Sequence, residues 1–438
     1  MVEFFHAYDL RGKYPNQISE EEAERLGKAY GTYIDDNDVL VARDGRTHGE
    51  KITKAFIKGV NSTGTNVTDI GMVPSPLLYF AVDELDFNHG VVVTASHNPS
   101  EYTGFKFTLS GGLAMSRDNG MMEIEEIYEE RSFIHGEGQV KHRDMKEMYV
   151  EKVSAKFNAD IDVAVNYGNG VTSVIGSQLL EAIGCNVKNI NEEVDGNFPN
   201  HLADPTNKKA QQALKEEMSD EDLGVLFDGD GDRAGFIFDG EYITEDEVLA
   251  LFSQKLLECT KGKVVHDLRA SKLVKEKIRV SGGDAIESRV GHTFISEMIH
   301  SDPEIIFAGE LSGHYYFPSI GFPWDDGLIA ACLMSEIVST GEITRLESYP
   351  SYPVSPELRI DCPVDRKKIV IEKVKEKFSE YELNDKDGVK IEFENGWALV
   401  RPSNTEEKMS LRCEADTEKD LEQILEKVES VVRENCKA

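Results

Sequence analysis

Acidic residues and glycines alternate in the segment "VLFDGDGDRAGFIF", which spaces three carboxylates two residues apart. They belong to Asp228, Asp230 and Asp232, and Arg233 follows directly. In an extended loop every second side chain points to the same side, and glycine lets the backbone approach an ion closely. Because three hard oxygen ligands suit Mg²⁺, we predict a magnesium site here. Arg233 would then stabilise a phosphoryl group transferred beside the metal.

Two other interpretations of this loop are a calcium-binding EF-hand and a solvated acidic turn. An EF-hand loop has glycine at its sixth position and glutamate at its twelfth, where this chain has Arg233 and Asp239. The flanking apolar runs are also typical of strands and not of helices. A solvated turn would not need three carboxylates between apolar strands, so the pattern favours the metal site.

A serine and a histidine follow the β-branched run in "VVVTASHNPS". The run predicts a strand buried on both faces, and Pro99 disfavours helical geometry at Asn98. Ser96 and His97 therefore belong to a loop at the carboxyl end of a strand, where open α/β sheets bind ligands. Taken alone, a loop serine that bonds its own backbone is the simpler interpretation.

Hydrogen-bonding groups also gather in "RPSNTEEKMSLR". Two arginines flank small polar residues there, a composition that favours an anion-binding nest, with a plain strand-to-turn junction as the alternative. The residues are Arg401, Ser403, Asn404, Thr405 and Arg412.

Weaker signals come from "GELSGH", whose glycines expose side chains able to hold sugar hydroxyls or move a proton. Its polar residues are Glu310, Ser312 and His314. Arg11, Lys106 and His292 carry little information on their own.

Alternating helical and strand patterns must position these residues. They predict an α/β fold with three similar α/β domains of mixed, largely parallel sheets, followed by a smaller C-terminal α+β domain. The stretch "SYPSYPVSP" is the best candidate for a linker. Four domains are predicted. Residues 1–145 contain the serine loop (TASHNP), 146–242 the metal loop (DGDGDR), 243–348 the sugar loop (GELSGH) and 349–438 the anion nest (RPSNTEEKMSLR).

Charge and hydropathy restrict the partners. The net charge of −33, from 81 acidic and 48 basic residues, argues against nucleic-acid binding, and an anionic substrate would need a locally built cationic site. No apolar run reaches the length of a membrane span, and the first ten residues lack a basic region typical of a secretory signal. We expect a cytoplasmic protein that contacts neither nucleic acid nor membrane.

Together, the TASHNP, DGDGDR, GELSGH and RPSNT motifs resemble those of the α-D-phosphohexomutase family, in the same order and across the whole chain. The family includes enzymes of the phosphomannomutase/phosphoglucomutase type and phosphoglucosamine mutases. The resemblance implies three α/β domains of shared topology and a smaller phosphate-binding domain. One departure is that Glu407 and Lys408 stand where the family usually has a proline, which leaves the shape of that turn open.

The resemblance also implies roles for single residues. Ser96 would be the phosphoserine and would complete the Mg²⁺ shell with Asp228, Asp230 and Asp232. Arg11, His97, Lys106 and Arg233 would surround the transferred phosphoryl group. The sugar would be held by His292, Glu310, Ser312 and His314, and the non-reacting phosphate by Arg401, Ser403, Asn404, Thr405 and Arg412. Arg269 would be a further basic phosphate contact.

The implied reaction interconverts hexose 1-phosphate and hexose 6-phosphate, with mannose or glucose as the sugar, through a hexose 1,6-bisphosphate that also serves as activator. Lys106 or a neighbouring histidine would handle the hydroxyl proton. Alternatives are a phosphoglucosamine mutase, a metal-dependent sugar-phosphate phosphatase and a non-catalytic sensor of sugar phosphates. We expect a monomer or weak homodimer.

Overall fold

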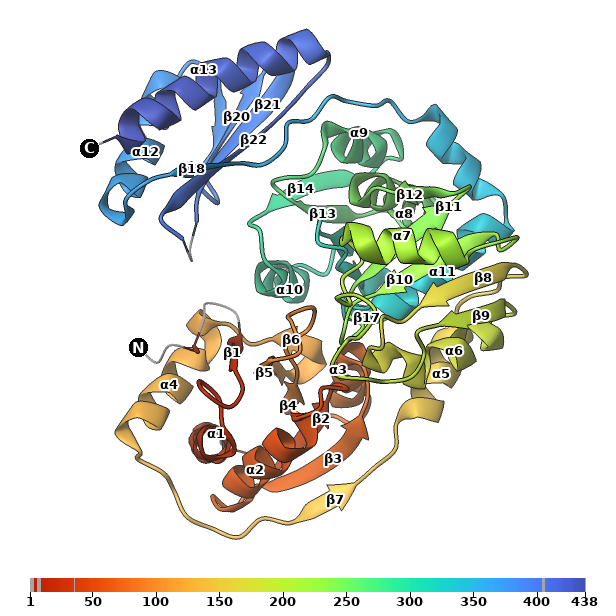
Figure 1. The fold of residues 1–438 in the computed structure, drawn as a ribbon, viewed down its shortest axis with the longest axis vertical. Coiled ribbons are helices and arrows are strands. Elements are labelled where there is room, and N and C mark those ends of the chain that lie inside the picture. The colour runs from red at the N-terminus through yellow and green to blue at the C-terminus, as the bar shows by residue number, and fades with distance from the viewer. Residues whose placement is uncertain (1–3, 6–8, 35, 404–405, 438) are drawn as a thin grey trace.

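The computed structural model describes all of the chain except residues 1–3, 6–8, 35, 404–405 and 438. Four β-sheets follow one another along it, each with its own helices (Figure 1). One hydrophobic core runs through the first three sheets, whereas the fourth has a core of its own. The division into four domains at the predicted residues stays a prediction; β12 runs across residues 242 and 243, where one boundary was expected.

The first sheet has the order β1-β5-β4-β2-β3-β7, with β6 paired to β5. Its strands are β1 (Leu10–Lys13), β2 (Asp38–Arg43), β3 (Asn66–Met72), β4 (His89–Val93), β5 (Tyr102–Leu109), β6 (Leu113–Ala114) and β7 (Val140–His142). The helices are α1 (Glu20–Tyr33), α2 (Gly49–Asn61), α3 (Ser75–Glu84) and α4 (Met121–Glu130). In β4, Val91 and Val93 enter one core while Val92 enters the other, so both faces are covered, as the β-branched run predicts.

The second sheet has the order β12-β11-β10-β8-β9 and the third β14-β13-β15-β16-β17. The second contains β8 (Asp162–Asn166), β9 (Asn186–Ile190), β10 (Leu223–Phe227), β11 (Ala234–Phe238) and β12 (Glu241–Ile243), with α5 (Lys146–Ser154), α6 (Gly176–Ala182) and α7 (Lys208–Glu217). The third contains β13 (Lys263–Asp267), β14 (Asp284–Ser288), β15 (Ile305–Gly309), β16 (Tyr315–Phe317) and β17 (Phe322–Asp325), with α8 (Glu245–Cys259), α9 (Lys272–Val280), α10 (His292–Ser301) and α11 (Gly327–Ser339).

These three sheets share one arrangement. Each contains three adjacent parallel strands, to which the first sheet adds β7 as a fourth, and an antiparallel strand pairs with the last of the three along the chain. That pair is β4 and β5, then β10 and β11, then β15 and β16. The TASHNP, DGDGDR and GELSGH motifs each fall in the connection between the two strands of such a pair. One topological position, used three times, therefore carries all three motifs.

The C-terminal sheet is antiparallel, with the order β18-β22-β21-β20-β19. Its strands are β18 (Leu358–Asp361), β19 (Glu382–Asn384), β20 (Val389–Phe393), β21 (Gly396–Pro402) and β22 (Lys408–Ala415), and its helices are α12 (Val364–Lys377) and α13 (Glu418–Cys436). Both helices cover one face (Figure 1). On the other face, Trp397 and Leu399 pack against Leu268 of the third sheet's unit. The predicted fold class, three mixed α/β sheets and a smaller α+β unit, is confirmed.

Among the described residues, no single helix is long and apolar enough to cross a membrane. Only α11 and the short helix at Glu342–Ser348 reach such a length together, as a pair bent by 84°.

Candidate active site

The serine loop begins with a residue in strained geometry. Ser96 has a φ of 48°, in the left-handed region that side chains other than glycine rarely adopt. Its backbone N–H donates to Oγ1 of Thr94 at 2.9 Å, which tightens the turn after β4. The hydroxyl of Thr94 in turn donates to Asp44 at 2.8 Å and to Asp230 at 3.1 Å. The loop is therefore held from both the first and the second sheet.

A buried arginine fixes the rest of this loop. Arg46 donates to the backbone carbonyls of Ser96 at 2.8 Å and Asn98 at 2.6 Å, and to those of Pro99 and Tyr102. Its Nε lies 3.1 Å from Asp44, and both side chains are only 1% exposed. Asp44 and Arg46 were not predicted from the sequence. Their segment, "RDGR" at the end of β2, has no pattern that distinguishes it from other strand ends.

The three predicted metal ligands converge. Oxygens of Asp228, Asp230 and Asp232 lie within 4.8 Å of one another, and all three residues are buried. The two intervening glycines have different causes. A Cβ at position 229 would lie 2.5 Å from the carbonyl oxygen of Ser96, and Gly231 has a φ of 80°, which favours glycine. The loop of the three aspartates can thus approach the serine loop only because residue 229 has no side chain.

Ser96 and the aspartates form one centre. Oγ of Ser96 donates to Oδ2 of Asp228 at 2.7 Å, so residues from two sheets meet at the expected phosphorylation site. Lys106 on β5 enters the same centre, with Nζ 2.7 Å from Oδ2 of Asp230 and in contact with Asp232. Burial opposes the charge of Lys106, but these two carboxylates hold its pKa well above the usual value. Lys106 is therefore positively charged here.

The donor set fits a divalent cation. Oδ1 of Asp230 and Oδ1 of Asp232 are buried and accept no hydrogen bond from the residues that the structure describes. Burial, with the charges of Asp232 and Asp230, raises the pKa of Asp228 well above its usual value. The positive charge around Asp228 is therefore too small to offset burial and the two neighbouring carboxylates. An ion bound by the free oxygens would supply that charge with the hard ligands that Mg²⁺ prefers.

Arg233 connects the metal loop to the sugar loop. Its Nε donates to Nε2 of His314 at 2.9 Å, and Nδ1 of His314 lies 2.8 Å from Asp325 at the end of β17. A β-bridge also joins Arg233 and His314. Asp325 was not singled out from the sequence, because one acid at a strand end gives no local signal. The chain Arg233–His314–Asp325 sets the orientation of the histidine ring.

His97 and Arg11 lie beside the serine. Nδ1 of His97 is 3.2 Å from Oγ of Ser96, and the positive charge of Arg233, with burial and Arg11, lowers the pKa of His97 to about 2. The imidazole is therefore neutral. Arg11 donates to Oδ1 of Asn98 at 2.6 Å and pairs with Asp9, so the structure brings it to the same loop.

The sugar loop and the start of α10 meet through Glu310. Gly291 donates its backbone N–H to Oε1 of Glu310 at 2.9 Å, and burial raises the pKa of that carboxyl group. The ring of His292 lies 5.9 Å from that of His314, and burial lowers the pKa of His292 to about 4. Ser312 lies between Glu310 and His314 in the same loop. The structure thus groups all four expected sugar contacts.

Arg269 is tied to the sugar loop by a shared partner. It forms a two-point ion pair with Asp267, with Nη2 2.7 Å from Oδ2, and the same oxygen accepts from Leu311 N at 3.1 Å. The pair orders the loop and leaves the Arg269 side chain partly exposed.

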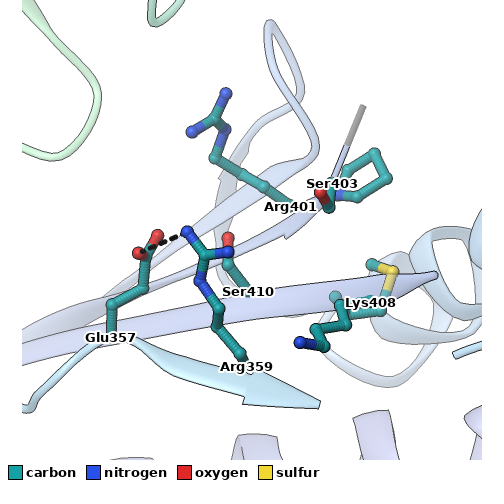
Figure 2. A pocket seen from close by; sticks show the side chains of 8 residues that line it. Glu357, Arg359, Arg401, Ser403, Lys408 and Ser410 are labelled. Atoms are coloured by element: carbon teal, nitrogen blue, oxygen red, sulfur yellow. Dashed lines mark ion pairs between the residues drawn. The ribbon is translucent and has the colours of Figure 1, made fainter. Parts of the chain in front are cut away.

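The C-terminal unit contains a separate cationic cavity of about 160 Å³. Its labelled lining residues are shown in Figure 2: Glu357, Arg359, Arg401, Ser403, Lys408 and Ser410. Arg359, Ser410 and Arg401 stand at paired positions on β18, β22 and β21. Arg359 and Lys408 were not expected from the sequence, because only the sheet register brings them to Arg401. Three cationic side chains around a small cavity suit a phosphate group.

Arg412, a further residue of the predicted nest, does not line this cavity. Arg412 lines a neighbouring cavity with Asp246, Tyr349 and Tyr352, beside the linker. Asn404 and Thr405 fall outside the described residues. The turn that lacks the usual proline is held by Lys367, whose Nζ donates to the carbonyls of Ser403 at 2.6 Å and Glu406 at 2.5 Å.

Models of the phosphoglucomutase/phosphomannomutase family match the chain at alpha/beta/alpha domain I (residues 2–135), domain II (145–241), domain III (244–350) and the C-terminal domain (358–431). A phosphomannomutase/phosphoglucomutase from Pseudomonas aeruginosa is 35% identical over 99% of this chain and 95% of its own length. A phosphomannomutase from Methanocaldococcus jannaschii is 35% identical, covering 98% and 97%.

A solved structure has the same fold. The crystal structure of a phosphoglucomutase/phosphomannomutase family protein from Burkholderia thailandensis superposes with a TM-score of 0.90 at 30% identity, covering 99% of this chain and 98% of that one. Fold and site thus define a four-unit α/β protein whose three repeated loops build one acidic centre. The chain belongs to the phosphoglucomutase/phosphomannomutase family.

Proposed function

We propose that this protein is a phosphohexomutase that interconverts hexose 1-phosphate and hexose 6-phosphate, with mannose or glucose as the sugar. The names of its relatives support this activity. The observation that carries the proposal is the contact between Ser96 and Asp228 at 2.7 Å, inside a centre of three buried aspartates. A second cationic cavity lies in the C-terminal unit.

Two anion sites are what a mutase needs. Phosphate on the sugar must be held at one end while the other end reacts, and the sugar must then reverse. A phosphatase needs no such second anchor. We assign the reacting end to the centre around Ser96 and the anchoring end to the cavity beside Arg401, as the sequence motifs predicted.

Asp228, Asp230 and Asp232, with a phosphate oxygen on Ser96, would hold a Mg²⁺ ion. When bound, the ion would neutralise charge on the phosphoryl group as a Lewis acid. The chain itself supplies further positive charge, because Lys106 and Arg233 both reach this centre.

In the first half-reaction the bond between phosphorus and Oγ of Ser96 breaks, and a bond from phosphorus to a sugar hydroxyl forms. The hydroxyl proton passes through a neighbouring histidine to Oγ of Ser96, because Lys106 is already protonated, and the serine hydroxyl that forms donates to Asp228. The resulting hexose 1,6-bisphosphate reverses and returns its other phosphoryl group to Ser96. Added bisphosphate therefore activates enzyme that has lost its phosphate.

The test is a mutase assay on mannose, glucose and glucosamine 1-phosphates, with catalytic hexose 1,6-bisphosphate supplied. We expect turnover of the mannose or glucose compound to the 6-phosphate. Preference for the glucosamine compound would replace the proposed sugar, and release of inorganic phosphate without 6-phosphate would replace the mutase by a phosphatase.

A further inference from the structure

Asp387 forms an ion pair with Arg401, one of the cations that line the C-terminal cavity. Oδ2 of Asp387 lies 2.7 Å from Nη2 of Arg401, and each side chain is 17% exposed. Figure 2 shows the guanidinium of Arg401 directed away from Arg359 and Lys408, which also line the cavity. Nε of Arg401 is buried and donates to none of the described residues. The arginine is thus partly engaged and partly without a partner.

The turn that carries Asp387 cannot move independently of β21. Gly388 has a φ of 80°, and a Cβ on it would lie 2.2 Å from the carbonyl oxygen of Val400. On its other side, Lys386 donates to the carbonyl of Glu287 at 2.7 Å, and Asn384 donates to the Glu287 carboxylate at 2.7 Å. The turn between β19 and β20 is therefore fixed between β21 and the end of β14.

The same carboxylate oxygen reaches the sugar-binding side. Val290 donates its backbone N–H to Oδ2 of Asp387 at 3.2 Å, and the next residue, Gly291, donates to Glu310 at 2.9 Å. His292 follows directly and begins α10. Two consecutive N–H groups of this loop are thus held by a carboxylate of the C-terminal unit and by one of the sugar loop.

We propose that Asp387 is a positioning residue that couples the phosphate cavity to the loop before His292. Its carboxylate competes with ligand phosphate for Nη2 of Arg401, because both are anions that need the same donor. When phosphate takes Arg401, the carboxylate of Asp387 loses the cation that orients it toward Val290, although the backbone of its turn stays fixed. Binding in the C-terminal unit thereby loosens the third unit's loop at the moment when the sugar must be accepted or reversed. The proposal deepens the proposed function and rests on it.

Two substitutions separate the halves of this coupling. Asp387→Asn removes the charge but keeps an oxygen for Val290, whereas Asp387→Ala removes both. Asp385→Asn is the matched control, because Asp385 lies in the same turn but pairs with Lys375 on α12. Inorganic phosphate is the probe, with its binding measured by calorimetry, and backbone hydrogen exchange at Val290 reports on the loop.

We expect both Asp387 variants to bind phosphate about three- to tenfold more tightly than the natural protein, and the control to be unchanged. Only Asp387→Ala should speed exchange at Val290 and lower kcat. Because this variant also binds phosphate more tightly, its KM and kcat should fall together. In an Arg401→Ala background, Asp387→Asn should no longer change phosphate affinity.

Unchanged or weaker phosphate binding by Asp387→Asn would overturn the competition, as would an equal gain in the Arg401→Ala background. Unchanged exchange at Val290 in Asp387→Ala would overturn the link to the loop. Phosphate affinity and exchange at Val290 are measured without turnover. This proposal can therefore fail while the mutase assay succeeds, and the mutase assay can fail while this proposal holds.

Discussion

Oγ of Ser96 and Oδ2 of Asp228 lie 2.7 Å apart although 132 residues separate them in the chain. The serine is the donor, so its hydrogen bond stabilises the charged form of a carboxylate whose pKa burial has already raised. A phosphate on Ser96 would replace this donor by an anion of about −1.5 to −2 charge. The contact is therefore stable in the dephosphorylated form and requires a cation in the phosphorylated one.

Asp230→Asn should weaken Mg²⁺ binding and turnover together. Asp230 also accepts from Ser75 and Lys106, and the amide keeps an oxygen for one of these donors while losing the charge that attracts the ion. Titrating activity and calorimetric heat against Mg²⁺ measures both effects. The control is Asp239→Asn, outside the cluster. Full activity of the Asp230 variant at the natural Mg²⁺ requirement would remove Asp230 from the metal site.

Local motifs made the site largely predictable, whereas its supports were not. Each of TASHNP, DGDGDR and GELSGH is a polar run after an apolar strand, and the repeated topology brings the three together. Arg46, Lys367 and Arg359 act through long-range contacts that depend on strand register and helix placement. Arg412 was predicted to share a nest with Arg401 but lines a different cavity, because Ser410 and Arg412 share a face of β22 and lie beside different cavities. Its role in phosphate binding stays a prediction.

Arg401→Ala should lower kcat/KM by about ten- to hundredfold for both the 1-phosphate and the 6-phosphate, because one anchor must hold either phosphate in turn. Loss of the anchor should also let bisphosphate escape and raise the need for added activator. Arg433→Ala, on the exposed side of α13, is the control. Steady-state kinetics in both directions measure the effect. A loss confined to one substrate would contradict a shared anchor.

Lys367→Met should raise KM with little change in kcat. The ammonium group of Lys367 donates to the carbonyls of Ser403 and Glu406, in the turn proposed to bind phosphate, and methionine has a side chain of similar length without the donors. Lys368→Met, one residue further along α12 and exposed, is the control. If the KM values of the two variants agree, the turn keeps its shape without Lys367, and the missing proline needs another explanation.

Glu287 should make docking of the C-terminal unit sensitive to acid. Burial opposes its charge, but Lys390 at 2.6 Å lowers the pKa of Glu287 to about 2, from 4.5 in an unstructured chain. Because the folded pKa is depressed, this stabilisation is complete above about pH 4.5 and is lost as the pH falls toward 2. It amounts to at most about 3 kcal/mol.

Thermal unfolding of the natural protein and of Glu287→Gln, followed from pH 7 to pH 3, measures this effect. The difference in unfolding free energy between them should shrink below pH 4.5. A difference that does not depend on pH would show that the carboxylate is not ionised at the interface.

The central claim is that Ser96 passes a phosphoryl group to and from the sugar. Protein labelled with ³²P by hexose 1,6-bisphosphate, freed of ligand and mixed with excess unlabelled glucose or mannose 1-phosphate in a single turnover, tests it directly. Peptide mapping locates the label before mixing, and Ser96→Ala shows the background. We expect label on Ser96 that moves into hexose bisphosphate and 6-phosphate. Label on another residue, or label released only as inorganic phosphate, would contradict it.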